Sequence, residues 1–216
     1  MSRDLAQLIA AREPEQRASL GVGVVIGIVT NNRDEEGLSR VKVRFPWLDD
    51  TSESFWARIA APMAGPGRGA YFLPEVEDEV LVAFEHGDIR FPYVIGSLWN
   101  GVDKPPVASG KGNNDLRVIK SRSGHLIKLN DEHGKETVEI IDASGKNSVV
   151  IDTATNSITI TAEKDITLAA PKGTIRITAQ TVEIAASKSG TLTAGGDMTV
   201  RADGDLTVKG QTVNIN

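Results

Sequence analysis

The stretch 197-DMTVRADGDLTVKGQTVNIN-216 repeats a short pattern that decides the fold of the second half of the chain. Its apolar residues come in pairs with one residue between them, Met198/Val200, Leu206/Val208 and Val213/Ile215, and the pairs recur about every eight residues. Alternation of apolar and polar residues predicts β-strands. Each strand is too short to make a sheet with its neighbours in the same segment, so it needs another surface to pack against.

The same pattern extends back to residue 158, with steps of seven to nine residues and one weak pair, Gly190/Leu192. An internal repeat usually means a solenoid. Eight residues, however, extend at most about 26 Å at roughly 3.3 Å each, too little for one chain to close a coil around a core. We therefore predict a homotrimer in which three chains each supply one face of a triple-stranded β-helix. Its interior would be lined by Ile158, Ile160, Ile166, Leu168, Ile175, Ile177, Val182, Ile184, Leu192, Met198, Val200, Leu206 and Val208.

Four segments upstream alternate in the same way: 127–131, 138–142, 149–153 and 158–162. Gly, Asp and Asn lie between them and suit tight corners. Pro171 falls at a predicted corner, where its missing N–H does no harm to a ladder. The sequence therefore predicts a β-helix domain over residues 124–216.

The first half of the chain has a different composition, because all ten aromatic residues lie between Phe45 and Trp99. Its β-branched and aromatic segments predict five strands, separated by Asn-Asn, Asp-Asp and Gly-Pro-Gly turns. Five short strands in so few residues favour an OB-fold barrel, over residues 21–101, with a linker over 102–123. The aromatic residues Phe55, Trp56, Tyr71, Phe72 and Trp99 are expected to form ordinary barrel core. The predicted strands are 22–30, 40–45, 54–60, 79–85 and 93–98.

Composition excludes several classes of protein. A net charge of −5 argues against a nucleic-acid-binding surface. The absence of cysteine excludes disulfides and thiolate metal sites. Residues 1–20 lack the apolar core of a signal peptide, which predicts synthesis in the cytoplasm without export. Leu5, Leu8 and Ile9 have helical spacing, so this segment is expected to be a short helix or tail that contacts a partner.

Three motifs could carry chemistry, and each has a more ordinary interpretation. The stretch GVGVVIG (21–27) lacks the third glycine of a phosphate loop and is expected to be a barrel strand. Glu75, Glu77, Asp78 and Glu79 could supply paired carboxylates for glycoside hydrolysis, but solvated residues before a strand are favoured. His86, His125 and His133 stand singly, and only a trimer could gather three copies of His125 around a metal ion. We therefore expect no catalytic residue, cofactor or metal, and leave an axial ion near His125 open.

The segments RVKVRFPWLDD, FWARIAAPMAGPGRGAYFLPEVEDEVLVAFEHGD and FPYVIGSLWNG closely resemble the OB-fold of phage baseplate assembly protein V and of VgrG-type spikes. The repeats that follow are similar to the triple-stranded β-helix of the same family. The resemblance implies a non-enzymatic, homotrimeric central spike in the baseplate of a phage-tail-like particle or virion. It also implies three partners: a baseplate hub, here contacted by Leu5, Leu8 and Ile9; a PAAR-type tip protein; and, transiently, the target envelope.

Two departures from the family refine this expectation. Only the short linker stands where some family members carry a lysozyme domain, and about twenty residues precede the barrel where others carry a hub domain. The chain is therefore expected to be a stand-alone spike. Residues Val213, Asn214, Ile215 and Asn216, with no histidine near them, are expected to dock a separate tip protein. The alternatives are a polysaccharide depolymerase on a β-helical stem and a glycan-binding OB module; phage, bacteriocin and toxin injector also remain open.

Overall fold

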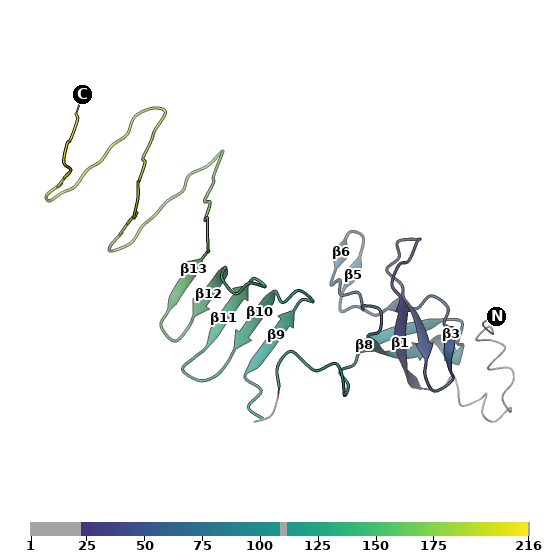
Figure 1. The fold of residues 1–216 in the computed structure, drawn as a ribbon. Helices are drawn as coiled ribbons and strands as arrows, with labels where there is room; N and C mark the ends of the chain where they lie inside the picture. The colour runs from purple at the N-terminus through teal and green to yellow at the C-terminus, as the bar shows by residue number, and fades with distance from the viewer. Residues whose placement is uncertain (1–22, 109–111, 216) are drawn as a thin grey trace. The chain divides into compact units, whose positions relative to one another are not determined.

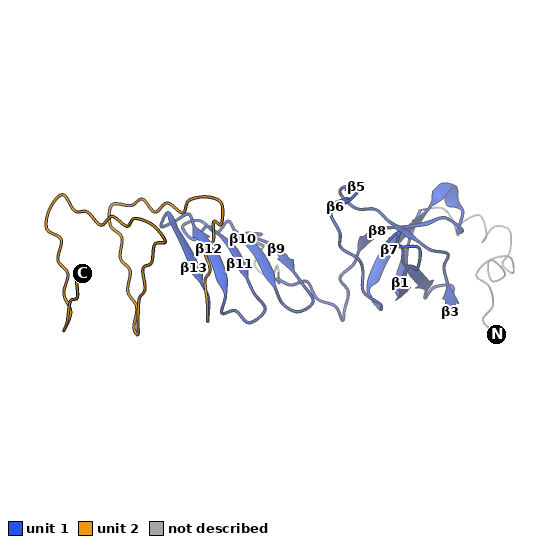
Figure 2. Ribbon diagram, turned by 90° about the horizontal axis from the view of Figure 1, so that it is seen from above, with its two compact units in different colours: residues 1–163 blue, residues 164–216 orange. Residues whose placement is uncertain are grey.

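The computed structural model describes residues 23–108 and 112–215, and the chain divides into two compact units, residues 1–163 and 164–216 (Figure 2). The described residues are all-β, with one 3-10 turn (Glu85–Gly87) and no α-helix. The described residues contain no helix that is long and apolar enough to cross a membrane. The all-β prediction is confirmed, while the predicted N-terminal helix or tail lies outside the described residues.

The first sheet of unit 1 curls into the predicted small barrel (Figure 1). Neighbouring strands are antiparallel, except for a parallel pair of β4 and β8. Val41 and Ala57 exchange two backbone hydrogen bonds, of 3.0 and 2.7 Å, and so join β2 to the segment before β4. The strand order is β3 (Asp49–Glu53), β2 (Lys42–Phe45), β1 (Val24–Asn31), β7 (Glu79–Phe84), β8 (Pro92–Ser97) and β4 (Arg58–Ile59).

Side-chain alternation builds the barrel core. In β2, Val43 and Phe45 point inward while Lys42 and Arg44 point outward, as the sequence predicts. Gly27 of β1 allows close packing, because a Cβ there would lie 3.3 Å from Val43 and Val82. Most of the core is β-branched, which suits the narrow interior of a small barrel. The core comprises Val29, Val41, Val43, Phe45, Ala57, Val80, Val82, Phe84 and Val94.

The prediction that the aromatic residues form the core is wrong for most of them. Tyr71 and Phe72 are each 69% exposed and Trp99 is 68% exposed, and Phe55 is exposed as well. Trp56 is half-buried, with the cationic groups of Arg40 and Lys42 5.6 and 5.4 Å from its ring. These aromatic residues lie outside the regular strands, so no strand turns them inward, and valines fill the interior instead.

Two strand boundaries also differ from the prediction. The predicted Asp49-Asp50 turn lies inside β3, and of the predicted strand 54–60 only Arg58–Ile59 is a strand. The buried hydroxyl of Ser54 accepts a hydrogen bond from Val43 N–H at 3.1 Å, which replaces a ladder bond and ends the regular pairing. The Gly65-Pro66-Gly67 turn is confirmed, and it joins two further short strands, β5 (Ala64–Gly65) and β6 (Arg68–Gly69).

The second sheet of unit 1 is an antiparallel meander of five strands. The four strands predicted upstream of residue 163 are confirmed, each beginning one residue earlier than predicted. The first strand of the sheet was missed, because it lies in the predicted linker 102–123. The strands are β9 (Leu116–Lys120), β10 (Leu126–Asn130), β11 (Thr137–Ile141), β12 (Ser148–Asp152) and β13 (Ser157–Thr161).

Polar side chains hold the corners of this meander. The Asp142 carboxylate accepts hydrogen bonds from the Ser144 hydroxyl and from the backbone and side-chain N–H groups of Asn147, which hold its pKa well below the usual range. Asn147 Oδ1 in turn accepts a 3.0 Å hydrogen bond from the backbone N–H of Glu163. The Asp and Asn corners predicted from the sequence therefore satisfy backbone groups that the ladders leave unpaired.

Unit 2 is a zigzag of extended segments (Figure 1). None of its described residues, 164–215, pairs in a strand, and all of them are exposed. Pro171 opens one of its turns, as predicted. Turns or bends recur at the predicted spacing, at 171–173, 180, 187–188, 195–196, 203–204 and 211.

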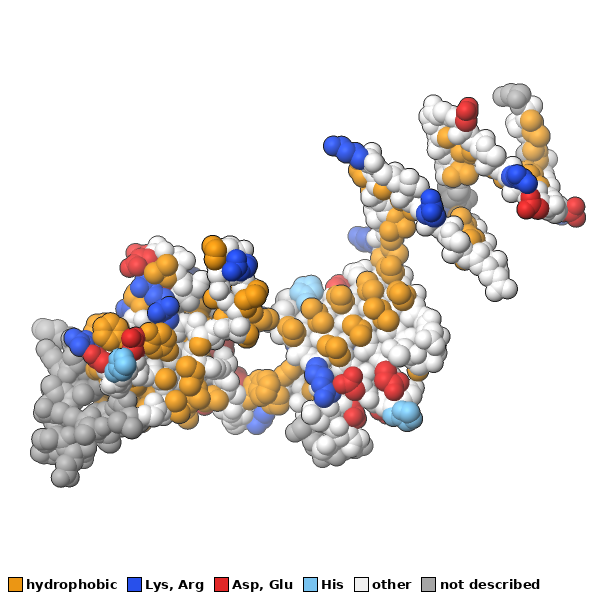
Figure 3. Space-filling model, turned by 180° about the vertical axis from the view of Figure 1, so that it is seen from behind, with side chains coloured by type: hydrophobic (Ala, Val, Ile, Leu, Met, Phe, Trp, Pro, Cys, Tyr) orange, Lys and Arg blue, Asp and Glu red, His pale blue; other side chains and the backbone are white. Residues whose placement is uncertain are grey.

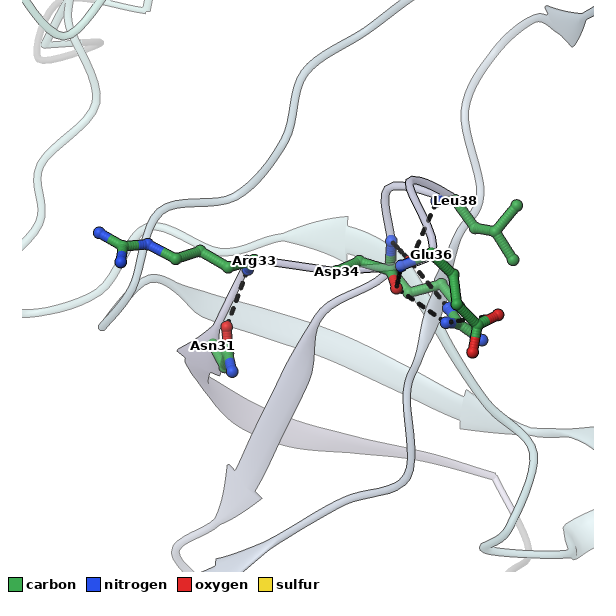
Figure 4. A network of polar contacts seen from close by, with 6 residues as sticks. Asn31, Arg33, Asp34, Glu36 and Leu38 are labelled. Carbon is green, nitrogen blue, oxygen red and sulfur yellow. Dashed lines mark hydrogen bonds and ion pairs between the residues drawn. The ribbon is translucent and has the colours of Figure 1, made fainter.

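A buried carboxylate holds the loop between β1 and β2 (Figure 4). Asp34 is paired with Arg40 at 2.8 Å, and its side chain is only 3% exposed. It also accepts hydrogen bonds from the backbone N–H groups of Glu36, Leu38 and Arg40. The Arg40 guanidinium and these N–H groups hold the pKa of Asp34 well below its usual range.

Asp34→Asn is expected to lower the unfolding temperature of the barrel. Since folding depresses this pKa, the stability from Asp34 is present above its unfolded pKa of about 3.9 and is lost as the pH falls below it. The difference between variant and parent should therefore shrink in acid. Tryptophan fluorescence measures this, because no tryptophan follows Trp99. Glu35→Gln, on the same loop but exposed, is the control; an equal effect of both substitutions would contradict this role of Asp34.

Candidate assembly interface

The register of the meander gathers apolar side chains on one of its faces (Figure 3). Ile127 lies opposite Ile119 and Ile140, and Ile151 lies opposite Val138 and Ile158. Directly paired residues point to the same side of a sheet. We call this the apolar face; it consists of Ile119, Ile127, Leu129, Val138, Ile140, Val149, Ile151, Ile158 and Ile160.

The apolar face lacks a covering layer among the described residues. The exposed fraction is 39% for Val138, 54% for Ile140 and 68% for Ile158. A sheet normally buries its apolar face against another layer. An exposed apolar patch of this extent marks a surface that binds another chain.

The opposite face of the meander carries charged and polar pairs. Lys128 and Glu139 lie opposite each other in the register, and Lys128 Nζ is 2.7 Å from Glu139 Oε1. Partial burial alone would raise the pKa of Glu139, but hydrogen bonds from Lys128 and Thr137 outweigh it and lower the pKa. Thr159 and Thr161 belong to the same face. This face is therefore mixed, whereas the apolar face is almost entirely aliphatic. The apolar residues of the mixed face are Leu116, Val118, Leu126, Ile141 and Val150.

The predicted interior residues fall in both units. Ile158 and Ile160 lie in β13, on the apolar face, while the others occupy the extended segments of unit 2 and are all exposed. Within the described residues of unit 2, the only backbone hydrogen bond joins Gly173 N–H to Ala170 O. Backbone N–H and C=O groups that a fold buries need partners. The inward orientation of these side chains in a trimer stays a prediction.

The other predicted contact residues are only partly described. Val213, Asn214 and Ile215 are exposed in unit 2, whereas Asn216 and the proposed hub contacts Leu5, Leu8 and Ile9 lie outside the described residues. The predicted interior residues begin at Ile158, so they leave out the apolar-face residues of β10, β11 and β12, whose segments alternate, as well as Ile119 of β9. In its segment, LRVIK, apolar residues fall on both faces of the strand. The alternation that marks the later strands therefore cannot be recognised there.

The acidic residues before β7 each have a separate partner. Glu75 pairs with Arg122 at 3.0 Å, and Glu77 pairs with Arg44 at 3.3 Å. The Asp78 carboxylate accepts a 2.8 Å hydrogen bond from Glu75 N–H, which closes a turn. Glu79 accepts one from the Asn100 side chain at 3.1 Å. These contacts favour a structural role for the carboxylates over paired catalysis.

The histidines and the glycine-rich stretch also lie in structural surroundings. His125 Nδ1 accepts a 3.1 Å hydrogen bond from Ala143 N–H, and His133 lies 3.7 Å from Glu136. His86 lies in the 3-10 turn. Within residues 23–108 and 112–215, no group of three His, Asp or Glu side chains could hold a metal ion. Of the stretch 21–27, the residues from Val24 onward belong to β1, the predicted barrel strand.

Comparison with known proteins finds a match for each half of the chain. Residues 25–99 match the type VI secretion system/phage-baseplate injector OB domain, and residues 127–216 match a family described as an uncharacterized protein conserved in bacteria (DUF2345). The type VI secretion system spike proteins VgrG2a and VgrG1a of Pseudomonas aeruginosa are 29% and 26% identical over 50% and 62% of this chain. The actin cross-linking toxin VgrG1 of Vibrio cholerae is 30% identical over 49% of it.

Both parts of the chain thus resemble VgrG-type baseplate spike proteins. The resemblance seen in the sequence, and the OB-fold it implies, are thus confirmed. The matches span 15%, 23% and 10% of the lengths of VgrG2a, VgrG1a and the actin cross-linking toxin. The chain therefore matches only a part of much longer proteins.

If other copies cover the apolar face, Ile158→Asp should destroy the assembly. Ile158 is largely exposed in one chain, so an aspartate there would cost an isolated chain little. In a covered interior, an unpaired carboxylate costs several kcal/mol, and symmetry repeats that cost in every copy. We expect the variant to lose its oligomer in sedimentation velocity. Thr159→Asp, on the opposite face, should keep it; equal behaviour of the two variants would contradict the assignment of faces.

Proposed function

We propose that this chain is the central spike of a contractile tail or injection-system baseplate, a homotrimeric piercing needle that punctures the target envelope. One observation carries the proposal: an uncovered apolar face is followed by fifty described residues of extended chain, 166–215, that form no strand pairing with any described residue. Both features are completed by further copies of the same chain. The similarity to VgrG spike proteins supports the same function.

Three copies suit the lengths of the segments. The bends of unit 2 recur about every eight residues, so each straight segment spans one side of a narrow triangle. In the proposed trimer, residues 21–101 form the barrel, and the triple-stranded β-helix runs from β9, inside the predicted linker 102–123, to residue 216. The pairs from Ile158/Ile160 to Leu206/Val208 point inward. Stiffness then comes from interchain backbone ladders and a continuous aliphatic interior, without any single essential side chain.

A mechanical function accounts for the residues better than the two alternatives. A depolymerase needs a carboxylate pair in an aromatic groove, yet no aromatic residue follows Trp99 and the acidic residues before β7 have other partners. A glycan-binding or strand-binding barrel needs available cations. Here Arg40, Lys42 and Arg44 are each paired with a carboxylate. We therefore propose that the chain is not an enzyme and requires no cofactor.

The proposed spike joins two other proteins. Residues 1–20, with Leu5, Leu8 and Ile9, contact the baseplate hub, and a PAAR-type tip protein binds at the other end of the stem. The particle assembles in the bacterial cytoplasm and meets the target envelope only transiently. Nucleic acid is not a partner, in keeping with the net charge of −5.

The proposal is tested on the purified full chain. Sedimentation equilibrium should give three times the mass of one chain, and the trimer should resist SDS until it is heated. The same trimer should neither cleave nor bind cell-envelope glycans. A stable monomer would overturn the proposed spike function, and hydrolysis of a glycan would favour the depolymerase alternative.

The tip interface predicts a second outcome. Val213, Asn214, Ile215 and Asn216 would present three copies of an apolar edge with unpaired backbone groups, which is a template for another chain. Changing Val213 and Ile215 together to Lys should abolish the pull-down of a PAAR-type protein while the trimer survives. Thr199→Lys/Thr207→Lys, at outward positions of earlier repeats, is the matched control and should bind normally. Unchanged binding by the first variant would place the tip protein elsewhere.

A further inference from the structure

The residue at the centre of each apolar pair faces outward in the proposed spike, and charge there is unusual. Six of these eight central positions are Thr or Asn, and only Arg176 and Glu183 are charged. They have opposite charges and belong to consecutive repeats. The central residues, in order, are Thr159, Thr167, Arg176, Glu183, Thr191, Thr199, Thr207 and Asn214.

The other charged residues of unit 2 lie at or within two residues of a turn or bend, the first of which is at 163–164. Arg201, for example, is paired with Asp203 at 2.8 Å, at the bend 203–204. Arg176 and Glu183 instead lie three or more residues from the nearest bend. Both are exposed, and neither forms an ion pair with any residue in the described part of the chain. Their charges are therefore unmatched among residues 23–108 and 112–215.

The geometry of a three-chain winding supplies the missing partner, and this step rests on the proposed function. Each bend carries a chain from one face of the triangular stem to the next, so consecutive segments of one chain lie on different faces. On any single face, the strand beside a given segment is then the next segment of another chain. This holds for either hand of the winding. The segment with Arg176 therefore lies beside the segment with Glu183 of a neighbouring copy.

We propose that Arg176 of each chain forms an ion pair with Glu183 of the next chain, and that three such pairs set the register of the spike. The repeat alone specifies register weakly, because a slip by one repeat keeps every apolar pair inward. Such a slip would place Arg176 beside a like charge or a threonine. Opposite charges on directly adjacent strands stabilise their pairing, and like charges destabilise it. The pairs are solvent-exposed, so they select the register more than they strengthen the trimer.

Cysteine cross-linking tests the juxtaposition directly, because the natural chain contains no cysteine. Adjacent strands lie about 4.8 Å apart, within the range of Cα separations that a disulfide spans. Oxidation of full-length Arg176→Cys/Glu183→Cys trimers should link all three chains covalently on a non-reducing denaturing gel. Arg176→Cys/Thr191→Cys is the matched control: its two cysteines lie two repeats apart and should give no covalent trimer.

Charge reversal provides the second readout. Arg176→Glu and Glu183→Arg should each lower the temperature at which SDS dissociates the trimer, and the double exchange should restore it. High salt should shrink all of these differences, because the pairs are exposed. Trimers without interchain cross-links, or a double exchange that restores nothing, would overturn this inference alone. A parent chain that is monomeric would overturn the proposed function instead.

Discussion

An extended polypeptide needs partners for its backbone, and this requirement governs the second half of the molecule. Residues 164–215 have strand-like segments and regular bends, yet no ladder within their own chain. Water can satisfy such a segment only while it stays a flexible single strand. A rigid rod requires ladders, and the available donors and acceptors belong to other copies. In the trimer that we propose, the repeat spacing, the polar corners and the aliphatic pairs all serve ladders built between chains.

The barrel and the stem depend on assembly in opposite ways. The barrel closes on itself through Val41 and Ala57 and buries its valines within one chain. The meander is intermediate, since its five strands pair within the chain but leave one face uncovered. After Glu163 even the strand pairing is missing. Stability should therefore be intrinsic at the barrel and increasingly dependent on protein concentration toward residue 215, because binding shifts folding by mass action.

The sequence predicted those elements whose side chains alternate without interruption. The strands β10 to β13 were predicted to within one residue, and the inward-facing and outward-facing residues of β2 were both predicted correctly. Prediction failed where local chemistry misled: Asp49-Asp50 suggested a turn but lies in β3, and Ser54 ends pairing through its hydroxyl. Aromatic content suggested a core, although Tyr71, Phe72 and Trp99 lie outside the strands that could turn them inward. The predicted interior residues were inferred from the spacing of the apolar pairs alone, whereas their proposed pairing requires other copies of the chain.

A repeated sequence can specify a long stem with few kinds of residue, but it specifies the register between the chains poorly. Each repeat presents a similar inward pair, so the apolar interior supplies cohesion with little preference among registers. Specificity must then come from features that do not repeat. The meander is one such feature, because its corners at Asp142 and Asn147 fix where the repeats begin. The proposed ion pair between Arg176 and Glu183 is another such feature, and it lies far along the chain from those corners. A chain of this kind can thus gain length by adding neutral repeats, while a few irregular residues keep three copies aligned.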